Sequence, residues 1–313
     1  MKLVEQGDGS AWTTLYLHQS DIDSYRKCPE QVRAAFKDDL FDPDSDSAYI
    51  GTLTHSFIEE CLHWYRATGE WPSETQIIEF LGVQQASLGE AWDSLWLHPH
   101  QVKDLEQGQK YLANCCVLWW NEIRPQLSVT NPEMWLIEHK FDICIDKKAT
   151  GARKVNLRGS IDFFDGVAIW DWKTGSSRNA WMKHRYDIQS TVYTWAMSNH
   201  LGGGVEVPFN LAFCPREKNE TTIIPLTRGL GHWGMMIEEA LAIARHVWSA
   251  EGDNRQWPLG PTDWWCSERW CALHAQGKCM GAVNPIYPEE AVYLTRLIGD
   301  GVERVPHGSD FDE

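Results

Sequence analysis

Residues 159–175 read GSIDFFDGVAIWDWKTG, and this stretch decides the fold. Apolar side chains alternate through residues 155–164 and continue in residues 166–172, a pattern typical of two neighbouring strands. Asp165-Gly166 stands between them and favours a two-residue hairpin turn. The stretch therefore predicts an antiparallel strand pair. Because an Asp before Gly is explained by such a turn, Asp165 is not a candidate metal ligand.

Each predicted strand carries an acid, Asp162 on the first and Asp171 on the second. Residues two apart in a strand project to the same face, so Lys173 is expected beside Asp171. Converging carboxylates suit Mg²⁺ or Mn²⁺, and such an ion can bind a phosphate oxygen and lower the pKa of a bound water. An adjacent ammonium group can orient that water and offset charge growing on phosphorus. Taken alone, Asp-x-Lys is more often a solvent-facing ion pair.

The surrounding sequence predicts a mixture of helices and strands. Helical spacing of apolar residues begins at Gly51 and ends before Gly69, which places His55 in the first turns of a helix, where it could complete the shell of the ion. Further segments follow in order: helical at 76–124, strand at 135–146, helix at 187–199, strand at 209–213 and helix at 234–247. We therefore expect a single α/β domain over residues 1–313, with a helical insertion at residues 70–130.

Composition excludes several classes of protein. A hydrophobic content of 43% in 313 residues is typical of a globular chain, and no apolar run is long enough for a membrane span. The first residues lack the apolar stretch of a signal peptide. Nine cysteines, an odd number, argue against a disulfide framework and for reduced thiols. A cytoplasmic protein without a membrane partner is expected.

The charge is unevenly distributed. A net charge of −16 is unusual for a protein that binds nucleic acid, since affinity for phosphates needs a positive surface. Residues 147–158 nevertheless hold five Lys or Arg and no acid, and residues 173–185 hold four more, again without an acid. Within these basic strips Arg158, Lys183 and Arg185 are candidate DNA contacts.

Four short motifs, taken in their order, resemble the PD-(D/E)XK nucleases, and among them the RecB and AddB nuclease domains and the CRISPR-associated RecB-like exonucleases, including phage relatives. The motifs are the glycine-to-histidine helix GTLTH at 51–55, the acidic strand GSID at 159–162, DWKTG at 171–175 and QSTVY at 189–193. The resemblance implies a restriction-endonuclease-like core, a mixed sheet flanked by helices. It also implies a metal-dependent DNA exonuclease acting on single strands or DNA ends in recombination, repair or replication.

The same resemblance implies roles for particular residues. The metal would be bound by His55, Asp162, Asp171 and the backbone carbonyl of Trp172. Lys173 would be the catalytic base or the group that positions water. The remaining two candidates, which would orient Lys173 and contact DNA, are Gln189 and Tyr193.

Cysteines near both ends form a further pattern. Cys266, Cys271 and Cys279 make a C-x4-C-x7-C run, and Cys28 is similar to the N-terminal single cysteine of relatives that carry a 4Fe-4S cluster. The resemblance implies such a cluster, which would fasten residues 20–30 to residues 260–285. Zinc bound by the three late cysteines and His274 is the alternative. The other cysteines, expected in the core, are Cys61, Cys115, Cys116, Cys144 and Cys214.

Two alternatives from other classes remain. The chain could be a catalytically silent DNA-binding module, although the intact acids and lysine weigh against that. It could also be a zinc-stabilised structural subunit of a larger helicase-nuclease. The sequence contains no G-x-x-x-x-G-K phosphate loop, so any unwinding would come from a helicase or recombination partner.

Overall fold

The computed structural model describes residues 2–4, 14–37, 45–95, 102–146, 153–175, 187–218, 220–249, 293–298 and 301–306. The chain forms two compact units. The larger consists of Lys2–Ile22 and Pro43–Arg245, and the smaller consists of Met1, Asp23–Asp42 and His246–Glu313. Whether they make up the single domain expected from the sequence stays a prediction.

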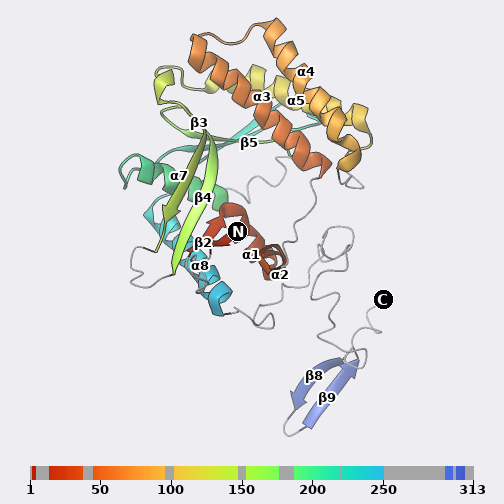
Figure 1. Ribbon diagram of the computed structural model, residues 1–313, viewed down its shortest axis with the longest axis vertical. Coiled ribbons are helices and arrows are strands. Elements are labelled where there is room, and N and C mark those ends of the chain that lie inside the picture. Colours follow the sequence, from red (N-terminus) through yellow and green to blue (C-terminus); the bar gives the residue numbers. More distant parts are fainter. Residues whose placement is uncertain are drawn as a thin grey trace. The chain divides into compact units, whose positions relative to one another are not determined.

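A mixed sheet is the framework of the larger unit (Figure 1). Neighbouring strands along it follow the order β1-β2-β4-β5-β6-β7, and β3 pairs with β4 as well. The β2–β4 and β5–β6 pairs are parallel and the other pairs are antiparallel. The strands are β1 (Lys2–Val4), β2 (Thr14–His18), β3 (Leu136–Cys144), β4 (Lys154–Phe164), β5 (Ile169–Lys173), β6 (Phe209–Phe213) and β7 (Thr222–Leu226). The predicted α/β class, a mixed sheet flanked by helices, is confirmed.

The β4–β5 hairpin that the sequence predicted is present, with its turn one residue later than expected. The backbone N–H of Asp165 donates to the carbonyl of Ala168 (3.2 Å), so Gly166 and Val167 occupy the turn. Gly166 has a φ of 87°, a conformation that favours glycine. The shift arises because the Asp165 carboxylate accepts the N–H groups of Val167 and Ala168, at 2.9 and 2.8 Å, and so sits at the base of the turn.

Helix α3 (Asp46–Thr68) carries the predicted histidine. The Ser45 side chain accepts the N–H of Ala48 and begins the helix, and Gly69, with a φ of 77°, ends it as expected. The helix thus begins before the predicted Gly51. His55 consequently lies in about the third turn and not the first.

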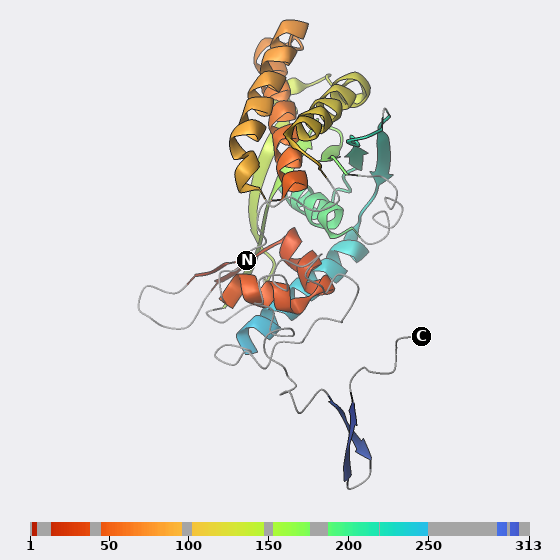
Figure 2. The same cartoon turned by 90° about the vertical axis from the view of Figure 1, so that its right-hand side faces the viewer.

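Three helices pack side by side at one end of the sheet (Figures 1 and 2). They are α3, α4 (Glu74–Ala91) and α5 (Leu105–Leu118), and α5 continues into a π-helical turn at Trp119–Ile123. Short 3-10 turns lie at Trp92–Ser94, Arg124–Gln126 and Pro132–Met134. The helical character predicted for residues 76–124 is therefore confirmed for 76–94 and 105–124, whereas residue 95 and residues 102–104 are described and are not helical.

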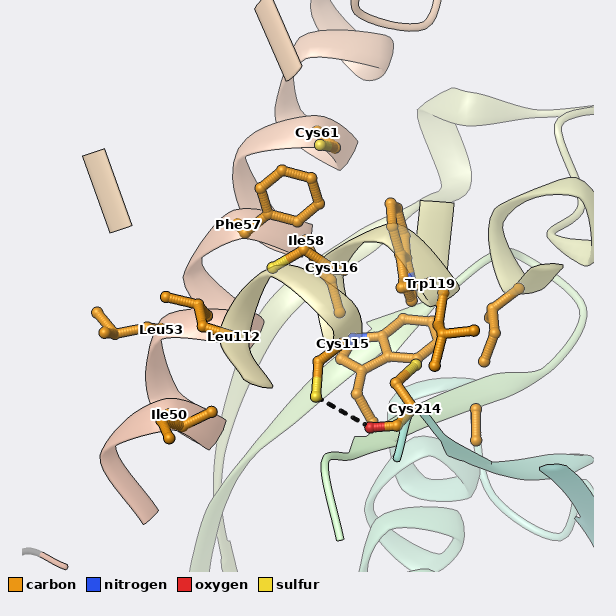
Figure 3. Close-up of a cluster of buried hydrophobic side chains, with 14 of the residues drawn as sticks. Ile50, Leu53, Phe57, Ile58, Cys61, Leu112, Cys115, Cys116, Trp119 and Cys214 are labelled. Carbon is orange, nitrogen blue, oxygen red and sulfur yellow. Dashed lines mark hydrogen bonds between the residues drawn. The ribbon is translucent and has the colours of Figure 1, made fainter. Parts of the chain in front are cut away.

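Tryptophans and cysteines fill the core between these helices and the sheet (Figure 3). Trp119 is fully buried and meets Phe57 and Trp172 edge to face, with ring centroids 6.5 and 5.9 Å apart. The thiol of Cys115 donates to the carbonyl of Cys214 (3.1 Å). Burial raises the pKa of Cys115 to about 12, so this thiol stays protonated at neutral pH.

Four of the five cysteines expected in the core are buried and one, Cys144, is half-buried. The buried four are Cys61, Cys115, Cys116 and Cys214. Burial raises the pKa of each of these thiols, which behave as small apolar side chains.

Helix α7 (Ile188–His200) belongs to the larger unit. Helix α8 (Leu230–Ser249) begins in the larger unit, which ends at Arg245, and its last residues belong to the smaller unit. Helices α1 (Gln19–Lys27) and α2 (Pro29–Lys37) meet at Cys28, which is buried. In the smaller unit, β8 (Tyr293–Ile298) pairs antiparallel with β9 (Gly301–Pro306). Among the described helices, none combines the length and the apolar character that crossing a bilayer requires.

Candidate active site

The site begins where two paired strands separate. β4 and β5 pair only at Phe163↔Trp170 and Phe164↔Ile169, so they diverge at the next residues, Asp162 and Asp171. The Asp162 carboxylate turns toward β5 and its Oδ2 accepts the backbone N–H of Trp172 (3.1 Å). The divergence thus leaves room for two acids without charging the core of the sheet.

Helix α3 brings His55 to the same place. Its Nε2 lies 3.0 Å from the carbonyl oxygen of Trp172, and its Nδ1 lies 3.5 Å from Oδ2 of Asp162. Gly51 lies one turn earlier on the helix. A Cβ added at Gly51 would lie 3.4 Å from Oγ1 of Thr174, which is van der Waals contact, so the helix approaches the end of β5 closely here. Three of the four predicted metal ligands, His55, Asp162 and the Trp172 carbonyl, therefore lie together.

Glu138 joins this group, although the sequence analysis treated it as an ordinary strand residue. It lies on β3 between the pairs Ile137↔Phe163 and His139↔Ile161, so it stands across from Asp162. Possible ligand atoms of His55, Glu138 and Asp162 all lie within 4.8 Å of one another. The backbone of Glu138 has a φ of 48°, the positive value that non-glycine residues rarely adopt and that recurs at functional sites.

Nothing in the strand pattern singled Glu138 out, because one acid on a half-exposed strand is common. Its orientation depends on the neighbouring strand, where the Ser160 hydroxyl donates to its Oε2 (2.9 Å). The signal that could have identified it is the antiparallel register, which places residue 138 opposite residue 162 once the turn is fixed.

Asp171 and Lys173 form an ion pair beside the group. The Asp171 side chain is 0% exposed, its Oδ2 lies 2.7 Å from Nζ of Lys173, and its Oδ1 has no hydrogen-bond partner among the described residues. Nζ of Lys173 also donates to Oε1 of Gln189 (2.8 Å), and Nε2 of Gln189 donates to the Tyr193 hydroxyl (3.1 Å). Helix α7 therefore contacts the lysine through Gln189, which Tyr193 contacts in turn.

The pKa values in the site follow from burial and from its crowded acids. Burial, together with the charge of Asp171, raises the pKa of Asp162 well above the usual range of an aspartate. Burial alone would lower the pKa of Lys173, but the carboxylates of Asp171 and Asp162 outweigh it and raise that pKa. Burial lowers the pKa of His55 in spite of the nearby acids, which favours the neutral imidazole that metals bind.

These residues fit a divalent cation. Carboxylate and carbonyl oxygens suit a hard ion such as Mg²⁺ or Mn²⁺, and Asp162, Glu138 and Trp172 present them. The imidazole of His55 adds a nitrogen ligand to these oxygens. The unpartnered Oδ1 of buried Asp171 is a further oxygen that a cation would satisfy. A cation would also relieve the repulsion between Asp162 and Asp171.

A pocket of about 1000 Å³ contains this group. Its wall extends from α3, between Ser47 and Glu59, to the β2–α1 junction at residues 18–20. Of the three predicted DNA contacts, Arg158 lines the pocket. The other two, Lys183 and Arg185, lie outside the described residues, as do Cys266, Cys271, Cys279 and His274.

Asp165 belongs to a different environment, as expected. Its Oδ2 accepts the N–H of Ser128 (3.0 Å) and the indole N–H of Trp170 (2.9 Å), in addition to the two turn contacts of Oδ1. The side chain is 3% exposed. Asp165 therefore stabilises the hairpin, and its oxygens are engaged away from the candidate metal site.

Comparisons with known proteins give a family. A provisionally named exonuclease from Eubacterium rectale matches with 15% identity and a TM-score of 0.44, over 74% of this chain and 80% of that one. A protein known as SSO0001 matches with 13% identity and a TM-score of 0.32, over 77% of this chain and 78% of that one. The comparison with curated proteins found no match. The model of the PD-(D/E)XK nuclease superfamily matches residues 17–276, which is more than half of the chain. The chain therefore belongs to the PD-(D/E)XK nuclease superfamily.

Proposed function

We propose that this protein is a Mg²⁺- or Mn²⁺-dependent deoxyribonuclease that removes nucleotides from single-stranded DNA or from DNA ends. The single observation that supports this best is the meeting of His55, Glu138 and Asp162 within 4.8 Å beside the Asp171–Lys173 ion pair. A bound cation would bind a phosphate oxygen of the substrate and supply a water of lowered pKa. His55, Asp162, Glu138 and the Trp172 carbonyl are the proposed ligands, with Asp171 contributing through its buried Oδ1.

Lys173 is proposed as the group that positions water and offsets charge on the phosphate. Without a bound cation, the carboxylates of Asp171 and Asp162 raise the pKa of Lys173 and favour the ammonium form, which cannot accept a proton. Of the two roles that the family resemblance implied, water positioning is therefore favoured over general base. Gln189 fixes the direction of Nζ, and Tyr193 fixes Gln189.

The test is cleavage of end-labelled single-stranded and linear double-stranded DNA by the full chain, with and without Mn²⁺. Lys173→Ala is expected to lower the rate by about a hundredfold or more, the usual effect of removing a group that stabilises transition-state charge. Lys154→Ala, which removes an exposed lysine of β4, is the matched control and keeps the wild-type rate. Products labelled at the 5′ or the 3′ end distinguish stepwise removal of nucleotides from internal cuts.

Three results would reject the proposal. Metal-independent cleavage, or a Lys173→Ala protein as active as the control, would contradict the assigned site. The absence of Mn²⁺-dependent cleavage on every DNA would instead favour the catalytically silent DNA-binding module.

The pathway that the nuclease serves is a separate proposal. We place its activity in recombination, repair or replication, in the cytoplasm, with a helicase or recombination partner.

We also propose that Cys28, Cys266, Cys271 and Cys279 bind a 4Fe-4S cluster, in preference to zinc. Support comes from the four-thiolate pattern that iron-sulfur clusters favour and from the burial of Cys28 at the junction of α1 and α2. The helices between residues 70 and 130 are proposed as an insertion into the nuclease core. Anaerobic purification followed by an absorption spectrum and iron and zinc analysis decides between the two metals.

A further inference from the structure

One positively charged side chain, that of Arg158, lies well away from the candidate metal site but on the wall of the same pocket. Arg158 is on β4, four residues before Asp162, so along an extended strand it is about 13 Å from the acid. Apart from Lys173, it is the one Lys or Arg among the described residues that line the pocket. Lys173 already contacts Asp171 and Gln189. Arg158 is therefore the positively charged side chain of this wall that could bind a second anionic group.

The guanidinium of Arg158 is held in a defined plane. Its Cζ lies 3.4 Å from the centroid of the Tyr16 ring, and β2 carries Tyr16 beside β4. A stacked guanidinium loses little further side-chain entropy when it binds a ligand. The arginine is therefore preorganised on the sheet surface although its side chain remains 37% exposed.

Asp142 holds one edge of the same group. Nε of Arg158 donates to Oδ2 of Asp142 (2.7 Å), and Nη2 lies 2.7 Å from that oxygen, across the β3–β4 pair. Asn156 in turn donates to Oδ1 of Asp142 (2.6 Å). Within the described part of the chain, Nη1 of Arg158 has no protein partner, so one edge of the guanidinium is available to a ligand. With Asp142 42% exposed, water screens its carboxylate, so its negative charge opposes an approaching phosphate only weakly.

We propose that Tyr16, Arg158 and Asp142 form a subsite for a second phosphate of the nucleic-acid strand, on the wall away from the phosphate that is cleaved. The inference rests on the proposed function, because it assumes a polyanionic strand in the pocket. Tyr16 sets the plane of the guanidinium, Arg158 binds the phosphate, and Asp142 fixes the edge that does not face the strand. Arginine suits this role because its planar fork matches phosphate oxygens.

The test is the salt dependence of binding. Affinity of the full chain for a fluorescein-labelled oligothymidylate is measured by fluorescence anisotropy in Ca²⁺ over a series of salt concentrations. Each phosphate contact to a single strand contributes about 0.7 to the slope of log affinity against log salt, so Arg158→Ala is expected to make the slope shallower by about 0.7. Lys154→Ala, which removes one charge from the same strand outside the pocket wall, leaves the slope unchanged.

Two more variants separate binding from a structural role. Arg158→Lys keeps the charge and is expected to keep the wild-type slope with weaker binding, because the stack and the fork are lost. Asp142→Asn keeps an oxygen that can accept from Nε of Arg158 but removes a negative charge near the phosphate, and is expected to tighten binding by up to about fivefold. If Arg158→Ala does not fold, these two variants and the control still decide the question.

An unchanged slope in Arg158→Ala, or weaker binding in Asp142→Asn, would overturn the proposal. Because binding is measured without cleavage, the result is independent of the proposed nuclease activity. A chain that binds the strand with an Arg158-dependent slope but cleaves no DNA would support the subsite while rejecting the proposed function.

Discussion

Replacing Asp162 with asparagine is expected to make the metal-free protein more stable and to abolish its response to metal. The asparagine Oδ1 can still accept the N–H of Trp172, so the contact that orients the side chain is kept. What is lost is a carboxyl group whose pKa is raised by burial and by the charge of Asp171. We expect the free energy of unfolding without metal to rise at neutral pH by on the order of 1 kcal/mol, as for other costly active-site charges.

The pH dependence provides the sign of this effect. The folded wild-type protein holds a proton on Asp162 more tightly than the unfolded chain does, because the folded-state pKa is raised. Its stability therefore falls as pH rises from the ordinary pKa of an aspartate toward the raised pKa of Asp162. The difference between Asp162→Asn and wild type should be small in acid and grow with pH.

Metal reverses the order of stability. A ligand at a hundred times its dissociation constant stabilises the folded state by about 2.7 kcal/mol, which for a protein of this size raises the melting temperature by about 4 °C. Wild type should show this rise with Mn²⁺, and Asp162→Asn should show almost none. Thermal unfolding with and without Mn²⁺ over a pH series is the assay. A variant that is less stable than wild type without metal, or that keeps the Mn²⁺ response, would refute the reasoning.

Three further outcomes are expected. Asp165→Ala leaves the buried N–H groups of Trp170 and Ala168 without acceptors and should lower the free energy of unfolding by about 3–5 kcal/mol, measured by urea denaturation; a loss under 1 kcal/mol would contradict this. Gly159→Ala would place a Cβ 2.6 Å from Cζ of Phe141, which packs against Tyr193, and should cost about 1–3 kcal/mol and lower cleavage; in a Phe141→Ala background the same substitution should cause neither loss. Cys271→Ala should remove the visible absorbance of the anaerobic protein, and a colourless, zinc-containing wild type would reject the cluster.

Sequence reasoning identified most readily the elements with long periodic patterns. Strand β4 and helix α3 each carry enough alternation or helical spacing for their type to be predicted. Of the five-residue strands, β5 and β6 were predicted and β2 and β7 were missed. β2 has five residues and runs directly into α1, and β7 contains Pro225, which weakens a strand pattern and is typical of a sheet edge.

Site residues that depend on pairing between distant strands could not be predicted from local pattern. Glu138 becomes a candidate ligand only because β3 pairs with β4 in a register that sets it opposite Asp162. Arg158 was a candidate from charge alone, whereas its stack on Tyr16 depends on a parallel pairing between residues far apart in the sequence. Both residues are identified by the register between paired strands, and the pattern of residues along a single strand does not contain that register.

Strand β4 pairs with β2, β3 and β5, and it carries both Asp162 and Arg158. Residues 156–158 and 163–164 of β4, on either side of Asp162, are paired on both edges, so they can open only when the neighbouring strands also detach and their amides should be among the slowest to exchange with solvent. Inactivation by denaturant would then coincide with collapse of the entire sheet and not precede it. Partial unfolding of the protein would therefore have little scope to regulate its activity.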